Sequence, residues 1–245
     1  MSTLDYSHEL DRLIELWDKH ADRPWETPSE RDGLNIALVN AFVSHSMNLA
    51  RGVRVLTREG LTFESTSLVR SMMECTATGA WLALYPDKTS DFTLHSAGGR
   101  KKTLDEIVKL GFDGGEGLIQ NTEFLDGRNP NAVDPEGKWL KHRFESMKGG
   151  DDLYLTYRVL CGWDHATGSL ADEYVEDVGR SDKNPWGIIM RGKADDFDPW
   201  TSMVAALALR AQIAADMVLV KPRHGTQLRN FARRFEVSDV IEPAV

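Results

Sequence analysis

The feature that most constrains this chain is a run of apolar and small residues spaced alternately by four and three positions. The run comprises Leu61, Ser65, Leu68, Met72, Cys75, Gly79 and Leu82. Because an α-helix turns once every 3.6 residues, this spacing puts all of them on one side of a helix that packs against another helix. Small Ser65 and Gly79 predict a close approach of that neighbour, and Pro86 predicts the end of the helix.

Helical patterns extend over most of the 245 residues. We expect helices over residues 4–20, 29–58, 62–85, 104–110, 138–147, 151–161, 166–175 and 199–221, with a basic helix at about 223–235. Thr103 and Glu106 form a capping box for the helix over 104–110. A Gly- and Pro-rich excursion covers 111–137, and one short extended piece is expected at Ile188 to Met190. The pattern therefore predicts an all-α fold, a single multi-helix bundle over 1–245 with its core at about 29–220.

The helix over 29–58 carries an apolar stripe that we expect to face the core. The stripe consists of Leu34, Leu38, Ala41, Phe42, Leu49, Val53 and Leu56. His45 lies beside these residues, and we interpret it as a structural histidine rather than a ligand.

Charge and composition exclude several classes of protein. The formal charge of −9 argues against a broad nonspecific nucleic-acid surface, which needs clustered Lys and Arg. The basic tail is the local exception, and it either contacts phosphates or forms a solvated helix; its cations are Lys221, Arg223, His224, Arg229, Arg233 and Arg234. Cys75 and Cys161 cannot build a disulfide framework. No secretion signal or membrane-spanning stretch is visible, so we expect a cytoplasmic protein without membrane contact.

The motifs of the common cofactor and metal enzymes are missing. The glycines between Gly111 and Gly117 do not follow a strand and lack the lysine of a phosphate-binding loop. No Glu is followed three residues later by His, as a diiron bundle requires. We therefore expect no cofactor and no metal. A metal site made of Glu74, Asp164 and His165 is a third hypothesis that no ligand spacing supports.

The helix over 62–85 has a second informative side, because Arg70 and Glu74 lie nearly opposite the packed side. Phe63, Ala77 and Trp81 share that side, which favours at least partial burial of the charged pair. One alternative is an exposed ion pair of a few tenths of a kcal/mol. The others are a buried structural clamp and a functional site, since burial of such a pair requires further hydrogen bonds.

A second polar cluster occupies residues 157–165, with Tyr157, Arg158, Asp164 and His165. Arg158 and His165 lie two turns apart and face the same side if the helix is continuous. His165 beside Asp164 is suited either to acid–base chemistry near neutral pH or to a structural role at a helix junction.

These residues resemble an uncharacterised bacterial family of helical proteins, whose pattern is an Arg-Ser-x-x-Glu helix followed by a later Tyr-x-x-Leu and a His. Arg70, Glu74, Tyr157 and His165 match that pattern, over roughly residues 51–175. Cys161 stands where the family usually has Ser. The resemblance implies an all-helical domain and supplies no activity.

A weaker resemblance is to the HEPN helical bundles, several of which are metal-independent ribonucleases with an Arg and a His separated by four to six residues. Arg158 and His165 have six residues between them, although Val159 replaces the usual polar residue. This resemblance implies catalysis by Arg158 and His165, an RNA substrate and a homodimer. Our leading hypothesis is instead an internal polar site that either fixes helix register or binds a small polar ligand or partner. Its residues are Arg70, Glu74, Tyr157, Asp164 and His165.

Overall fold

The computed structural model describes residues 4–20, 26–28, 33–110, 139–192 and 200–244. Its longer helices are α1 (Tyr6–Asp18), α2 (Gly33–Arg58), α3 (Thr66–Leu84), α4 (Thr89–Lys109), α8 (Gly150–Asp164), α10 (Trp200–Met217) and α11 (Gly225–Phe235). The shorter elements are α7 (Leu140–Glu145), α9 (Gly168–Asp172), the 3-10 turns η1 (Phe63–Ser65) and η2 (Pro86–Lys88), and the strands β1 (Val175–Asp177) and β2 (Ile188–Met190). The all-α prediction is confirmed, and the excursion expected at 111–137 lies outside the described residues.

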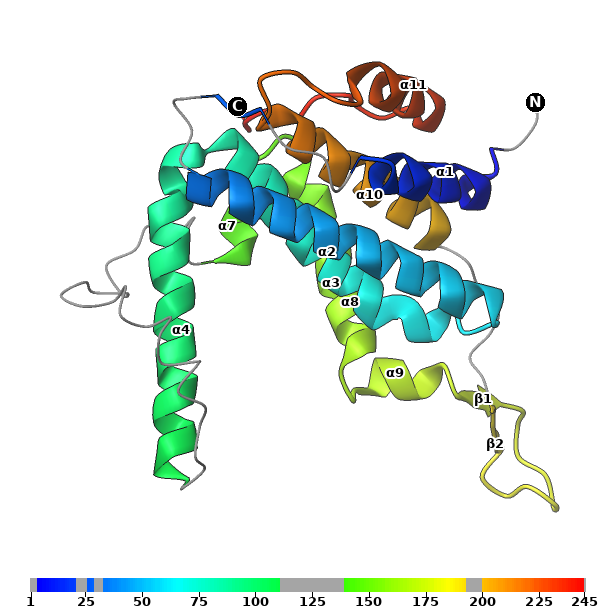
Figure 1. The fold of residues 1–245 in the computed structure, drawn as a ribbon. Helices are drawn as coiled ribbons and strands as arrows, with labels where there is room; N and C mark the ends of the chain where they lie inside the picture. Colours follow the sequence, from blue (N-terminus) through cyan, green and yellow to red (C-terminus); the bar gives the residue numbers. More distant parts are fainter. Residues whose placement is uncertain (1–3, 21–25, 29–32, 111–138, 193–199, 245) are drawn as a thin grey trace.

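The helices α2, α3 and α10 form the centre of the molecule, with α1 packed on α10 and α2 (Figure 1). The helices α7 and α8 pack on α3, and α11 covers part of α10. Figure 1 also shows α4 leaving the bundle in a direction of its own, and an arm made of α9, β1 and β2 beyond the end of α8. No helix among the described residues is long and apolar enough to cross a membrane.

The contact between α3 and α2 is as close as the small residues of α3 predict. Ser65, Met72, Gly79 and Leu82 are buried. A Cβ atom added to Gly79 would lie 3.4 Å from the Cβ atom of Phe42 on α2. Glycine at this position therefore lets the two helix backbones approach each other.

The buried side of α2 differs from the predicted stripe. Ala41 and His45 are exposed, and Leu34 is 39% exposed. The core side instead consists of Asn35, Val39, Val43, Ser46, Met47, Ala50 and Val53. Its two polar members find partners on other elements. Asn35 Nδ2 donates to the Leu82 carbonyl oxygen at 2.9 Å and to Thr89 Oγ1 at 2.9 Å, and Ser46 Oγ accepts a bond from Thr76. The search for an apolar stripe in the sequence did not find this side of α2, because two of its buried residues are polar and are satisfied by hydrogen bonds to other elements.

The prediction of a separate short helix over 104–110 is wrong, because α4 is one continuous helix from Thr89 to Lys109. Thr103 does not cap a helix start. Its Oγ1 donates instead to the carbonyl oxygen of Gly99, four residues earlier, at 3.3 Å. This back-bond is common for threonine inside helices, and it explains why a capping signature occurs here without a cap.

The extended piece predicted at Ile188 to Met190 is β2, and it pairs antiparallel with β1. Val175 lies opposite Met190, and Asp177 lies opposite Ile188. The helix predicted over 166–175 is shorter than expected, because α9 ends at Asp172. The residues of β1 were not predicted as a strand because their partner strand lies eleven or more positions further along the chain, beyond the reach of a local sequence pattern.

Candidate functional site

One side of α3 carries polar residues at successive spacings of three, four and four positions: Ser67, Arg70, Glu74 and Thr78. This side faces α8 and α7, where each of the four finds a polar partner. We call these four residues and their partners Arg143, Tyr157, Asp164 and His165 the Arg70 network. It joins α3 to the second half of α8.

Arg70 is the centre of this network. Its Nη1 atom lies 2.7 Å from Asp164 Oδ2, and its Nη2 atom lies 3.3 Å from Glu74 Oε1. Nη1 also lies 3.5 Å from His165 Nε2. Because a guanidinium group can only donate hydrogen bonds, Arg70 is the donor in this contact. The side chains of Arg70 and Asp164 are only 21% and 13% exposed.

Tyr157 completes the network from α8. Its hydroxyl donates to Glu74 Oε1 at 2.9 Å, and its ring centre lies 6.0 Å from Arg70 Cζ. Burial raises the pKa of Tyr157, and hydrogen bonding with Glu74 and Cys161 raises it further. The hydroxyl is therefore a neutral hydrogen-bond donor over the physiological pH range.

The charges of the network add up to zero when His165 is neutral, from the guanidinium groups of Arg70 and Arg143 and the carboxylates of Glu74 and Asp164. Burial by itself lowers the pKa of Arg70, but these two carboxylates raise it by a larger amount, and the net shift is upward. Arg70 is thus charged and already paired. A phosphate group would compete with these two carboxylates for the guanidinium.

Three residues of the network were not predicted from the sequence. Ser67 donates a hydrogen bond to Asp164 Oδ1, and Thr78 Oγ1 accepts one from Arg143 Nη1 of α7 at 3.2 Å. Arg143 also lies over the rings of Trp81 and Phe92, at 5.7 and 4.8 Å from the ring centres. Burial lowers the pKa of Arg143 to about 10, an effect that Glu74 opposes. The spacing of polar residues on α3 could have revealed Ser67 and Thr78, whereas nothing in the sequence marked Arg143.

Arg158 does not join the network. It is exposed, and within the described part of the chain no hydrogen bond or ion pair links it to His165. The helix α8 runs through Gly162 without a break, ends at Asp164, and leaves His165 with an extended backbone at φ −101° and ψ 155°. The two residues proposed for ribonuclease chemistry are thus both at the surface but are not in contact.

Two other predicted features have different surroundings from those expected. Among the described residues, no group of three or more His, Cys, Asp or Glu is placed to hold a metal ion, and this includes Glu74, Asp164 and His165. In the basic tail, Arg234 pairs with Glu9 at 2.7 Å, and the backbone amide of His224 donates to Asp216 at 2.9 Å. Part of this tail is therefore used for packing within the chain.

Comparison with known proteins identifies a family that includes the whole of the Arg70 network. Residues 36–184, more than half of the chain and all of the Arg70 network, match a family of unknown function, DUF5677. The comparison with curated proteins found no match. The comparison with solved structures found none either. The chain belongs to this uncharacterised family, DUF5677.

Proposed function

We propose that the Arg70 network locks α8 onto α3 at one register and so fixes the base of the arm formed by α9, β1 and β2. The observation that carries this proposal is the set of partners of Arg70. Its Nη atoms contact Glu74, Asp164 and His165, all of them groups of the protein. Carboxylates of the protein thus lie on two sides of this guanidinium group.

The position of Asp164 supports a locking role. Asp164 is the last residue of α8, where the partial negative charge of the helix end disfavours a carboxylate. Its side chain is also largely buried, so the carboxylate needs the Arg70 guanidinium and the Ser67 hydroxyl as partners. Sliding α8 along α3 by one turn would move Asp164 by about 5.4 Å and separate it from both partners. Only one register satisfies the network.

The register of α8 on α3 would also fix where the arm beyond α8 begins. Phe63, beside the start of α3, contacts the rings of Trp163 at the end of α8 and Tyr174 just before β1, each at 6.1 Å between ring centres. The Tyr174 hydroxyl donates to Glu64 Oε1 at 2.8 Å. These contacts join the start of the arm to the same end of α3 that the Arg70 network holds.

The test is native-state hydrogen exchange on the Arg70→Met variant, with Arg100→Met on α4 as the matched loss of an exposed arginine. We expect faster amide exchange in α8 and α9 of Arg70→Met, with unchanged exchange in α1 and α10. Arg100→Met should exchange like the wild type. Unchanged exchange in α8 of Arg70→Met would refute the locking role.

A metal-independent ribonuclease is the second candidate, and the exposure of both Arg158 and His165 supports it. In this mechanism the His165 imidazole would take the proton from the attacking hydroxyl, which requires its contact with Arg70 to open. Arg158 would stabilise the charge of the phosphate in the transition state. The assay is cleavage of RNA in the presence of a chelator, together with the oligomeric state, because this chemistry is expected from a dimer. Cleavage that survives His165→Ala would exclude the mechanism.

A further inference from the structure

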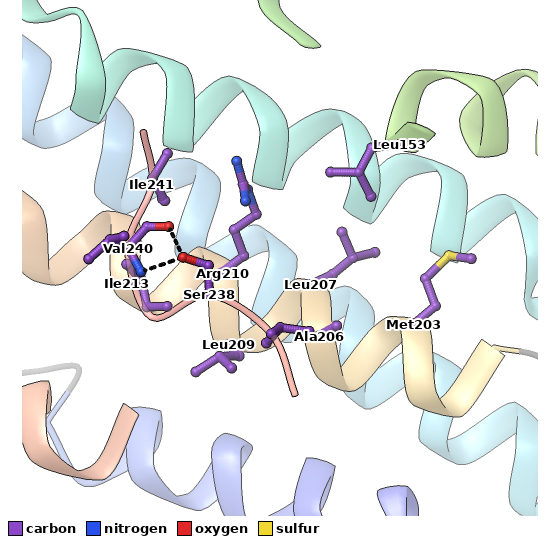
Figure 2. A pocket seen from close by; sticks show the side chains of 11 residues that line it. Leu153, Met203, Ala206, Leu207, Leu209, Arg210, Ile213, Ser238, Val240 and Ile241 are labelled. Carbon is purple, nitrogen blue, oxygen red and sulfur yellow. Dashed lines mark hydrogen bonds between the residues drawn. The ribbon is translucent and has the colours of Figure 1, made fainter. Parts of the chain in front are cut away.

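A cavity of about 170 Å³ lies away from the Arg70 network, between α10 and the chain that follows α11. Its walls are largely apolar and include Leu153 of α8, Leu207 and Ile213 of α10, and Val240 and Ile241 of the C-terminal segment (Figure 2). One lining residue is charged. Arg210 extends from α10 between Ile241 and the pair Leu153 and Leu207, as Figure 2 shows.

Arg210 differs from the other partly buried arginines of the bundle in its partners. Arg54, Arg70 and Arg234 each form an ion pair with a carboxylate. Arg210 has no such ion pair among the described residues. Its Nη2 atom lies 3.8 Å from the Met147 sulfur, a weak acceptor, and its buried Nε atom, like those of Arg70 and Arg234, makes no hydrogen bond. Burial lowers the pKa of Arg210, and no carboxylate of the described residues offsets this effect.

A buried guanidinium without an anionic partner raises the free energy of the folded protein, because the group has lost its hydration and has gained no ion pair in exchange. The chain has 38 acidic side chains, yet none of those described lies beside Arg210. The cavity thus combines an apolar volume with a guanidinium group whose natural partner is an anion.

The C-terminal segment forms the outer wall of the cavity and is held at both ends. The Val237 amide donates to the Ala232 carbonyl at 3.0 Å, and the Ala244 amide donates to the Ser146 carbonyl at 2.9 Å. Between these points Ser238 Oγ donates to the Val240 carbonyl and accepts from the Val240 amide, which makes a local turn (Figure 2). Specific hydrogen bonds therefore hold this wall of the cavity in place.

We propose that this cavity binds a small organic carboxylate, with its apolar body between α10 and the C-terminal segment and its carboxylate on the Arg210 guanidinium. A cavity of about 150 Å³ with apolar walls is known to accommodate benzene, so the volume suits a body of one aromatic ring. A carboxylate matches the planar donor pattern of a guanidinium group and forms charge-assisted hydrogen bonds with it. An inorganic anion would leave the apolar walls unused, and a neutral hydrocarbon would leave Arg210 unpaired.

The experiment is isothermal titration calorimetry of the full chain with phenylacetate, and with phenylacetamide as the neutral analogue of the same shape. We expect phenylacetate to bind the wild type at least about tenfold more tightly than phenylacetamide does, because a charge-assisted hydrogen bond contributes that much. The Arg210→Met variant should lose this preference, and Ala206→Phe, which fills the cavity, should bind neither compound. Arg100→Met, with the same change in charge on an exposed site, should bind like the wild type.

Three results would overturn the proposal: no binding of phenylacetate to the wild type, equal affinities for acid and amide, or acid binding that survives Ala206→Phe. Circular dichroism and thermal melting show whether Arg210→Met folds. If this variant does not fold, the comparison of acid with amide on the wild type and the loss of binding in Ala206→Phe still decide the outcome. The result is independent of the Arg70 network, because none of these variants alters it.

Discussion

The substitution Asp164→Asn tests whether the Arg70 network stabilises the fold. It removes one charge without changing the shape of the side chain. Breaking an ion pair costs about 3–5 kcal/mol when the pair is buried and about 0–1 kcal/mol when it is exposed. With Asp164 13% and Arg70 21% exposed, this pair lies nearer the buried limit. Glu74 continues to compensate part of the Arg70 charge, which reduces the loss.

A second contribution opposes the first. The last residue of a helix is an unfavourable place for a carboxylate, so removing the charge of Asp164 returns about 0.3–1 kcal/mol. We therefore expect a net loss of about 2 kcal/mol in the free energy of unfolding. Urea denaturation followed by circular dichroism measures this loss as a lower midpoint with an unchanged slope.

The matched control is Glu242→Gln. The ion pair of Glu242 with Lys148 has the same 2.7 Å distance between nitrogen and oxygen, but its side chains are 67% exposed for the lysine and 46% for the glutamate. We expect it to contribute at most about 0.5 kcal/mol. If Asp164→Asn costs no more than Glu242→Gln, the Arg70 network does not stabilise the packing of α8, and our reasoning from burial is wrong.

Three further predictions concern other parts of the chain. Gly150→Ala should cost at least about 3 kcal/mol in urea denaturation, because the new Cβ atom would lie 1.7 Å from the Phe144 carbonyl oxygen. Cys75, whose pKa is raised to about 11, mainly by burial, should react with iodoacetamide at pH 8 roughly a hundredfold more slowly in the native state than in urea, in a variant that lacks the other cysteine. The pKa of Asp11 is lowered from 3.8, chiefly by a hydrogen bond from Arg54, so its contribution is complete above that pH and lost as the pH falls below it. The difference in unfolding midpoint between wild type and Asp11→Asn should accordingly shrink in acid, and a constant difference would contradict this account.

The candidate site could be predicted from the sequence only as separate pieces. Arg70 and Glu74 are one turn apart on the same helix, and that spacing alone places them together. Tyr157 and Asp164 share the side of α8 that faces α3, seven residues apart. Whether the pair on α3 meets the pair on α8 depends on how the two helices pack. Helical periodicity says nothing about that packing, and only the resemblance to a known family suggested the contact.

What the sequence by itself determined is local: the helical class of the fold, the packed side of α3 with Gly79 against α2, and the extended piece at 188–190. The tertiary structure decided which polar residues are buried. Asn35 lies in the core because the Leu82 carbonyl and Thr89 accept its hydrogen bonds. Arg210 lines a cavity, and no carboxylate of the described part of the chain compensates its burial. The reason is physical. Helical periodicity depends on neighbours within a turn or two, whereas the cost of burying a polar group depends on partners that only the folded chain supplies.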